Sequence, residues 1–270
     1  MESELQRRVQ RYGWDKAAAH YETFWASQLQ PAQDLLLRLA DIQAGEKVIE
    51  LACGTGLVTF RIAEQLGSSG RLVATDLSGK MVNAIRAEAE RRGVNAEVAR
   101  MDAEALEYPD GAFDVAICAL GLMYCPSPAL ALREMYRVLA PGGRAAAAVW
   151  GARSHCGWAE IFPIVERRVA SDVCPLFFQL GSGNALELSF QAAGFRDTHS
   201  TRIQVALRYA SADDAIGAAF AGGPVALAYS RFDAATRESA HADYLESIAT
   251  YRSEDGYEIP GEFVVVTGAP

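Results

Sequence analysis

The sequence lacks long apolar runs, paired cysteines and concentrated basic stretches. A membrane-spanning helix needs about 20 mostly apolar residues, so we expect no transmembrane segment. The chain begins with MESELQRRVQRYGW, which is polar and charged, unlike a secretory signal sequence. These absences predict a cytoplasmic protein that does not insert into membranes.

The cysteines are odd in number and contain no C-x-x-C pair. This spacing argues against a disulfide framework and against a structural zinc site, so no bound metal is expected. Free cysteine behaves as a small apolar residue and is often buried. We expect that environment for Cys53, Cys118, Cys125, Cys156 and Cys174.

The charge balance is acidic, with 25 basic against 34 acidic residues and a net charge of −9. Proteins that bind nucleic acid neutralise its phosphates with clustered Lys and Arg, whereas the basic residues here are scattered. Nucleic acid is therefore not an expected partner. A chain of 270 residues without repeats or low-complexity tracts suits one large α/β domain. We expect a small-molecule partner, and a monomer or homodimer.

The most informative stretch that is present is residues 47–59, KVIELACGTGLVT. A short apolar run stops at a glycine-bearing turn before apolar residues resume, which predicts a buried strand, a tight loop and a helix start. Gly54 and Gly56 let a ligand lie directly against the main chain. A second apolar run, residues 71–75, ends in Asp76, where a carboxylate can accept hydrogen bonds from ribose hydroxyls. The pattern predicts a nucleoside-binding site.

The spacing of this loop distinguishes between nucleosides. A dinucleotide-binding loop reads G-x-G-x-x-G, but the third glycine position is Thr59 here. Glu50 precedes the loop, and its carboxylate would repel a pyrophosphate but could hold a cationic ligand. A nicotinamide-dependent oxidoreductase is therefore disfavoured, although it stays an alternative.

Several segments resemble one family. The pattern E-x-A-x-G-x-G over residues 50–56, followed by Asp76, resembles the first motif of class I S-adenosylmethionine-dependent methyltransferases. The order P-D-G-x-F-D-V (109–115) and then R-E-M-Y-R-V-L-x-P-G-G (133–143) resembles the same family. The segment W-x-x-x-A-x-x-Y-E (14–22) is similar to the start of its ubiquinone/menaquinone-biosynthesis members, where it closes over the cofactor.

The resemblance implies S-adenosylmethionine as cofactor and assigns residues to it. It places Tyr21 close to the cofactor, Leu77 and Met81 against the adenine ring, and Asp102 with Ala103 at the exocyclic amine. Two alternatives stay open: Met81 could equally be a core residue, and Asp102 could cap a short turn. The expected cofactor-binding residues are Tyr21, Glu50, Ala52, Gly54, Gly56, Asp76, Leu77, Met81, Asp102, Ala103 and Ala119.

The fold expected is α/β: a Rossmann-like, mostly parallel sheet with helices on both faces and an N-terminal helical cap. Five β–α units in series predict parallel strands with the ligand at their carboxyl ends. The resemblance implies seven strands, the final one antiparallel. We expect a helical lid over residues 1–44, a cofactor-binding core over 45–150, and substrate-side helices with the last two strands over 151–270. The expected strands cover residues 48–51, 71–75, 94–100, 115–120, 144–150, 202–207 and 262–267, and the main helices 3–40, 78–92, 129–139 and 184–195.

Catalysis is the least defined part. Related sequences often carry histidines and an aspartate in the loop after the fourth strand, where this chain has Met123, Tyr124 and Ser127. The candidate catalytic residues are Tyr124 and His155, and the latter has a suitable ordinary pKa of about 6.5. Aromatic residues, including Trp25 and Trp158, are expected around the acceptor. A sulfonium methyl is already activated, and positioning alone can contribute roughly 7–11 kcal/mol, so an obvious catalytic dyad is not required.

The expected function is therefore S-adenosylmethionine-dependent methyl transfer to a small-molecule metabolite by in-line displacement. One alternative is a protein that binds S-adenosylmethionine without transferring its methyl group, such as a sensor or a cyclase. Fold alone does not decide between these chemistries.

Overall fold

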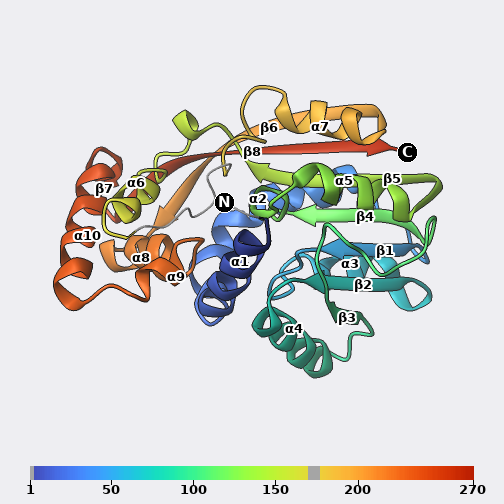
Figure 1. The fold of residues 1–270 in the computed structure, drawn as a ribbon, viewed down its shortest axis with the longest axis horizontal. Helices are drawn as coiled ribbons and strands as arrows, with labels where there is room; N and C mark the ends of the chain where they lie inside the picture. The colour runs from blue at the N-terminus through green and yellow to red at the C-terminus, as the bar shows by residue number, and fades with distance from the viewer. Residues whose placement is uncertain (1–2, 170–176) are drawn as a thin grey trace.

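A computed structural model describes residues 3–169 and 177–270, so Cys174 lies outside the described residues. A single mixed sheet crosses the molecule, with strand order β3-β2-β1-β4-β5-β8-β6 (Figure 1). Strands β1 to β5 are parallel to one another, and β8 runs antiparallel to β5, β6 and β7. The strands are β1 (Lys47–Leu51), β2 (Arg71–Asp76), β3 (Glu97–Arg100), β4 (Phe113–Ala119), β5 (Leu139–Trp150), β6 (Arg196–Tyr209), β7 (Arg252–Ser253) and β8 (Gly256–Ala269).

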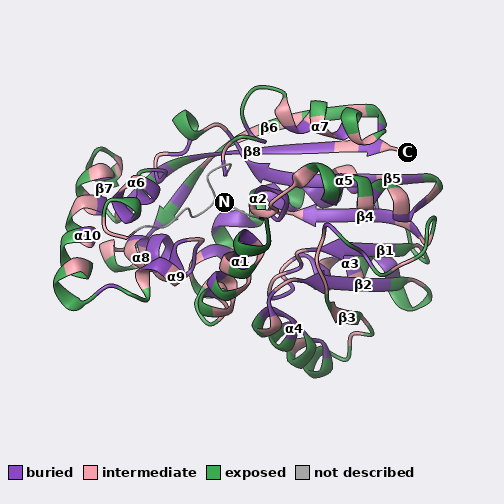
Figure 2. Cartoon of the chain, viewed as in Figure 1, coloured by how far each residue is buried: buried purple, intermediate pink, exposed green. Residues whose placement is uncertain are grey.

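Helices surround this sheet, which confirms the predicted Rossmann-like α/β architecture. Central strands such as β1 and β4 are buried almost throughout (Figure 2), as expected of parallel strands covered by helices. No helix in the described part of the chain is long and apolar enough to cross a membrane. The α-helices are α1 (Ser3–Ala17), α2 (Tyr21–Ala40), α3 (Thr59–Leu66), α4 (Gly79–Arg92), α5 (Pro128–Val138), α6 (Ile161–Glu166), α7 (Ala185–Ala193), α8 (Ala212–Ile216), α9 (Ala226–Tyr229) and α10 (Ala234–Ser247).

Local sequence signals fix several helix ends as predicted. The Ser78 hydroxyl accepts a hydrogen bond from the Met81 N–H and so caps α4. Gly93 ends this helix with a φ of 65°, a left-handed conformation that glycine adopts without steric cost. Gly194 ends α7 in the same way.

The strands differ from expectation mainly at the far edge of the sheet. β6 and β8 each contain 14 residues, longer than the predicted 202–207 and 262–267. They pair with each other from Arg196↔Ala269 to Tyr209↔Tyr257, well past the end of β5, so long-range pairing extends both strands. The short β7, which was not predicted, pairs with the start of β8 and adds an eighth strand.

The predicted N-terminal helical segment is divided in two. A turn at residues 18–20 separates α1 from α2. In Figure 1, α1 lies between the parallel strands and the helices α8 and α9. Those helices, with α10, belong to the segment that connects β6 to β8. The parallel strands and this inserted segment therefore face each other across α1.

Candidate functional site

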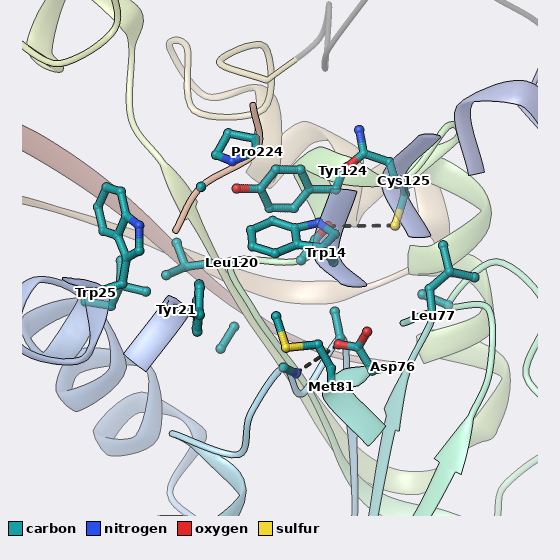
Figure 3. Close-up of a pocket in the computed structure, with 18 of the residues that line it drawn as sticks. Trp14, Tyr21, Trp25, Asp76, Leu77, Met81, Leu120, Tyr124, Cys125 and Pro224 are labelled. Carbon is teal, nitrogen blue, oxygen red and sulfur yellow. Dashed lines mark hydrogen bonds between the residues drawn. The ribbon is translucent and has the colours of Figure 1, made fainter. Parts of the chain in front are cut away.

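A cavity of about 970 Å³, part of it open to solvent, lies at the carboxyl ends of β1, β2 and β4 (Figure 3). One end is formed by the loops of the parallel sheet, and the other by aromatic residues and the inserted segment. The predicted cofactor residues that line it are Tyr21, Ala52, Gly54, Asp76, Leu77, Met81, Asp102, Ala103 and Ala119.

Asp76 connects the glycine loop to the end of β2. Its carboxylate accepts hydrogen bonds from the backbone N–H of Gly54 at 2.9 Å and of Ser78 at 2.8 Å. Each carboxylate oxygen can accept a further bond, which suits the hydroxyls of a ribose. Burial raises the pKa of Asp76 to about 6. The structure therefore holds this acceptor in place before any ligand arrives.

The backbone around the cavity adopts unusual conformations. Ala52, with a φ of 53°, and Leu120, with a φ of 61°, are non-glycine residues in the left-handed region, which is uncommon. Both follow the ends of central strands and line the cavity. A Cβ atom on the neighbouring Gly121 would lie only 2.4 Å from the Ala52 Cβ. Two strand ends are thus packed together closely, as is common at functional sites.

Two predicted cofactor residues are not among the described residues that line the cavity. Glu50 is buried beneath the loop, where it accepts a 2.5 Å hydrogen bond from the Thr59 hydroxyl, and burial raises its pKa to about 8. Gly56 faces away, since a Cβ there would lie 2.6 Å from Phe60 and 3.0 Å from Ile85. Both residues shape the loop from behind rather than forming its cavity surface.

Helix α1 covers the cofactor end of the cavity. Its Arg7 Nε lies 2.7 Å from Asp102 Oδ2, and the same guanidinium pairs with buried Glu104. One turn from its other end, Asp15 accepts hydrogen bonds from the Ser78 hydroxyl at 2.6 Å and from the Lys80 N–H at 3.1 Å. Polar contacts at two positions therefore anchor α1, and one of them involves Asp102, an expected cofactor-binding residue.

Arg7 was missed by sequence reasoning, and it gives a first prediction. We expect Arg7→Ala to speed release of S-adenosylhomocysteine about tenfold, because α1 loses its ion pairs with Asp102 and Glu104 while keeping the Asp15 contacts. Stopped-flow tryptophan fluorescence would measure the release rate. Arg8→Ala is the matched control, since Arg8 is exposed on the same helix. Equal release rates in both variants would contradict a fastening role for Arg7.

The raised pKa of Asp76 predicts a pH dependence of cofactor binding. The ionised carboxylate is the better acceptor for ribose, so affinity for S-adenosylhomocysteine should fall below a pH of about 6, by up to about tenfold per pH unit. The folded-state pKa lies above the ordinary value of about 4, so protonating Asp76 does not itself favour unfolding in this interval. Calorimetric titrations between pH 5 and 8, with melting temperatures measured alongside, would test this. A constant affinity down to pH 5 is incompatible with the assignment.

The other end of the cavity is aromatic. The expected residues Tyr21, Trp25, Tyr124 and Trp158 all line it. Trp14 of α1 packs edge-on against Tyr124, with ring centroids 4.9 Å apart, so the helix that covers the cofactor end also contacts the aromatic end. Sequence reasoning missed Trp150, at the end of β5, and the wall formed by Gly222, Gly223 and Pro224. No local signal marks that wall, because it belongs to the inserted segment, which packs against α1 and α2 from far away in the sequence.

One correction concerns His155, which was expected on the acceptor side. It is not among the described residues that line the cavity. Its ring nitrogen Nδ1 lies 2.9 Å from Glu262 Oε1, and its side chain is half exposed. Glu262 also pairs with Arg202 at 2.8 Å, so the carboxylate holds the loop after β5 against β8. His155 thus bonds to Glu262 away from the described cavity lining, whereas the other candidate, Tyr124, lines the cavity.

Comparisons with known proteins match the part of the chain that contains the glycine loop. A family model described as a methyltransferase domain matches residues 48–143. A ubiquinone/menaquinone biosynthesis C-methyltransferase of Enterobacter sp. is 39% identical over 105 residues, covering 38% of this chain and 42% of the relative. A demethylmenaquinone methyltransferase of Listeria welshimeri is 32% identical over 134 residues, covering 49% of this chain and 57% of the relative. The chain thus spans about half the length of these relatives.

Solved structures share the fold at low sequence identity. The YcgJ protein of Bacillus subtilis superposes with a TM-score of 0.63 and 17% identity, covering 89% of this chain and 98% of its own. The [4+2]-cyclase SpnF gives a TM-score of 0.55 and 21% identity, with 89% and 80% covered. These likenesses describe architecture alone. Residues 48–143 thus match a methyltransferase domain, and the chain resembles class I S-adenosylmethionine-dependent methyltransferases, whose cofactor is S-adenosylmethionine.

Proposed function

We propose that this protein transfers a methyl group from S-adenosylmethionine to a small-molecule acceptor. The observation that carries the proposal is that one continuous cavity joins the Asp76 end to the aromatic end around Trp25 and Trp158. A cofactor held at the first end can present its methyl group to a molecule held at the second. The aromatic lining supports an acceptor of low polarity.

The residues present fit the cofactor. Asp76 offers acceptors for the ribose hydroxyls, Leu77 and Met81 offer apolar surface for the adenine, and Gly54 leaves the main chain open for close approach. When bound, S-adenosylmethionine supplies an activated methyl group on a sulfonium. The chain's own part is to bind both molecules, orient the acceptor atom and exclude water, for which α1 and the inserted segment close the cavity. Tyr124 is the proposed residue for hydrogen bonding to the acceptor.

The proposed division of labour follows the cavity ends. Residues up to 44 act as the helical lid, residues 45–150 hold the cofactor, and residues 151–270 contribute the acceptor side. The contacts of α1 with both Asp102 and Ser78 support the first assignment. The wall from Gly222 to Pro224 supports the last.

A second candidate function is a cyclisation in which the cofactor is bound but not consumed. It is favoured by one observation, the shared fold with the [4+2]-cyclase SpnF. Both candidates need bound S-adenosylmethionine, but only methyl transfer consumes it. The two therefore differ in a product that can be measured.

Calorimetric titration with S-adenosylhomocysteine, with NAD as control, tests the cofactor site first. We expect micromolar or tighter binding of S-adenosylhomocysteine and no binding of NAD. A panel of aromatic acceptors with methyl-labelled S-adenosylmethionine then tests transfer, and labelled product is the expected result. Binding without labelled product from any acceptor, together with cyclised product from a polyene, would replace the proposal by the second candidate.

A further inference from the structure

Three tryptophans form a cluster at the acceptor end of the cavity, which we call the tryptophan recess: Trp25, Trp150 and Trp158. Trp158 lies 4.8 Å from Trp150 and 6.1 Å from Trp25 between ring centroids, and all three pairs meet edge to face. Trp25 comes from α2, Trp150 ends β5, and Trp158 lies in the loop before α6. All three line the cavity. Three separate parts of the chain thus converge on one surface.

Two donors in this recess have no partner among the residues that the structure describes. The indole nitrogens of Trp25 and Trp158 are shielded from solvent and make no hydrogen bond within the described residues. The two side chains are only 6% and 3% exposed. Buried polar groups are nearly always paired in folded proteins, so two unpaired donors on residues that line one cavity call for an explanation. A ligand that brings acceptor atoms to this wall supplies one.

The surroundings of Trp25 support that explanation. In Figure 3 its nitrogen-bearing edge faces the interior of the pocket, toward the segment that contains Pro224. Gly222 borders this edge, and a Cβ there would lie 3.3 Å from Trp25 Nε1. Gly222 has a φ of −89°, which any residue can adopt, so backbone conformation does not require glycine. Glycine at this position instead avoids a side chain that would crowd the edge of the indole ring.

The distribution of charge in the cavity further limits the chemical class of the ligand. Among the described residues that line the cavity, the charged ones are Arg7, Asp76 and Asp102, and all three belong to the cofactor end. No carboxylate therefore offsets a positive acceptor in the recess. The tryptophan rings also pack on one another, and Trp158 packs on Phe177 as well, so they do not form an open cage around a cation.

We propose that the methyl acceptor is an uncharged, planar molecule that presents oxygen atoms to the indole N–H groups of Trp25 and Trp158. The inference rests on the proposed methyltransferase function and specifies its substrate class. Ring packing in the recess favours a flat apolar body, and the two donors select molecules whose edge carries carbonyl or ether oxygens. Trp25 and Trp158 are then specificity-determining residues.

Size-matched probes test this selection. Coumarin is a flat bicycle with two oxygens on one edge, naphthalene has none, and N-methylquinolinium carries a positive charge. Ligand-observed NMR titrations, with the protein saturated with S-adenosylhomocysteine, would give the three dissociation constants. We expect coumarin to bind at least about fivefold more tightly than either other probe. Equal binding of naphthalene, or preference for N-methylquinolinium, would overturn the proposal.

Variants assign the preference to the two donors. Trp25→Phe and Trp158→Phe should each weaken coumarin binding about fivefold and change naphthalene binding less than twofold. Gly222→Ala keeps both indoles but fills the space beside Trp25, so it should also reduce the coumarin preference. Phe162→Leu is the matched control, because Phe162 packs on Trp158, with centroids 5.9 Å apart, without lining the cavity. A coumarin preference that is intact in both Trp variants, or lost equally in the control, would count against the proposal.

The two binding measurements distinguish a failure of this inference from a failure of the proposed methyltransferase function. Failure to bind S-adenosylhomocysteine would remove the methyltransferase proposal itself. Normal S-adenosylhomocysteine binding with no coumarin preference would remove only the acceptor class. Melting temperatures of all variants show whether each remains folded. Because neither indole N–H has a partner within the described residues, its loss alone should not lower them.

Discussion

Replacing Asp76 with alanine is expected to weaken S-adenosylhomocysteine binding by at least about 100-fold. A hydrogen bond to a charged group contributes about 1.5–3 kcal/mol, and a ribose can donate two of them to this carboxylate. The substitution also leaves the Gly54 and Ser78 N–H groups without their acceptor, so the loop loses its fixed geometry. Isothermal titration calorimetry at pH 8, where Asp76 is ionised, would measure the change.

Two comparisons make this result specific. Asp34→Ala removes a carboxylate that pairs with Arg61 in a half-exposed position, and it should leave the affinity within about twofold. Asp76→Asn preserves size but removes the charge, and it should fall between the parent and the alanine variant. If Asp76→Ala binds as tightly as the parent while remaining folded, the cavity end at β2 does not hold the ribose.

The second large effect is expected at Gly121. A Cβ at this position would lie 2.4 Å from the Ala52 Cβ and 2.8 Å from the Cys118 Sγ, distances that force neighbouring atoms to move. We expect Gly121→Ala to lower the free energy of unfolding by about 1–3 kcal/mol, the usual range for overpacking a core. Since Ala52 and Gly121 both line the cavity, cofactor affinity should fall as well. Urea denaturation and calorimetry would measure the two effects.

A second substitution, at Ala52, tests whether the clash with its Cβ causes the loss of stability in Gly121→Ala. Ala52→Gly removes the nearer clashing atom and also suits the left-handed φ of 53° at this position, so the double variant should recover most of the lost stability. Gly79→Ala is the control, since a Cβ there meets no atom within 4 Å. A double variant no more stable than Gly121→Ala alone would show that the Ala52 contact is not the source.

Sequence patterns predicted that the residues around Asp76 come together at one place in the fold, because their signals are local. The buried strand β1, the glycine loop and α3 follow one another within 20 residues. Ser78 caps α4, and Asp76, two residues before this cap, lines the cavity. The resemblance then placed Leu77, Met81 and Asp102, all of which the structure brings to the same cavity. Adjacent parallel strands must bring their carboxyl ends together, so order along the chain was enough.

The acceptor end could not be predicted in the same way. The Gly222–Pro224 wall belongs to the segment between β6 and β8, which starts where these strands extend beyond β5, a long-range register with no local marker. His155 was misplaced because its partner, Glu262, lies 107 residues away. Glu50 looked available for a cation, but Thr59, nine residues later, occupies its carboxylate. For His155 and Glu50, a polar partner that no local pattern reveals decided where the side chain lies.

The extended β6–β8 pair also has a consequence for protein engineering. Tyr209 and Tyr257 lie opposite each other in this pair, so the segment between them leaves and rejoins the sheet at adjacent positions. A two-residue hairpin turn could close that gap without altering the parallel strands. Different inserted segments could therefore be exchanged at this junction while residues 45–150 stay constant. The junction is thus a suitable place to recombine acceptor preferences among proteins of this architecture.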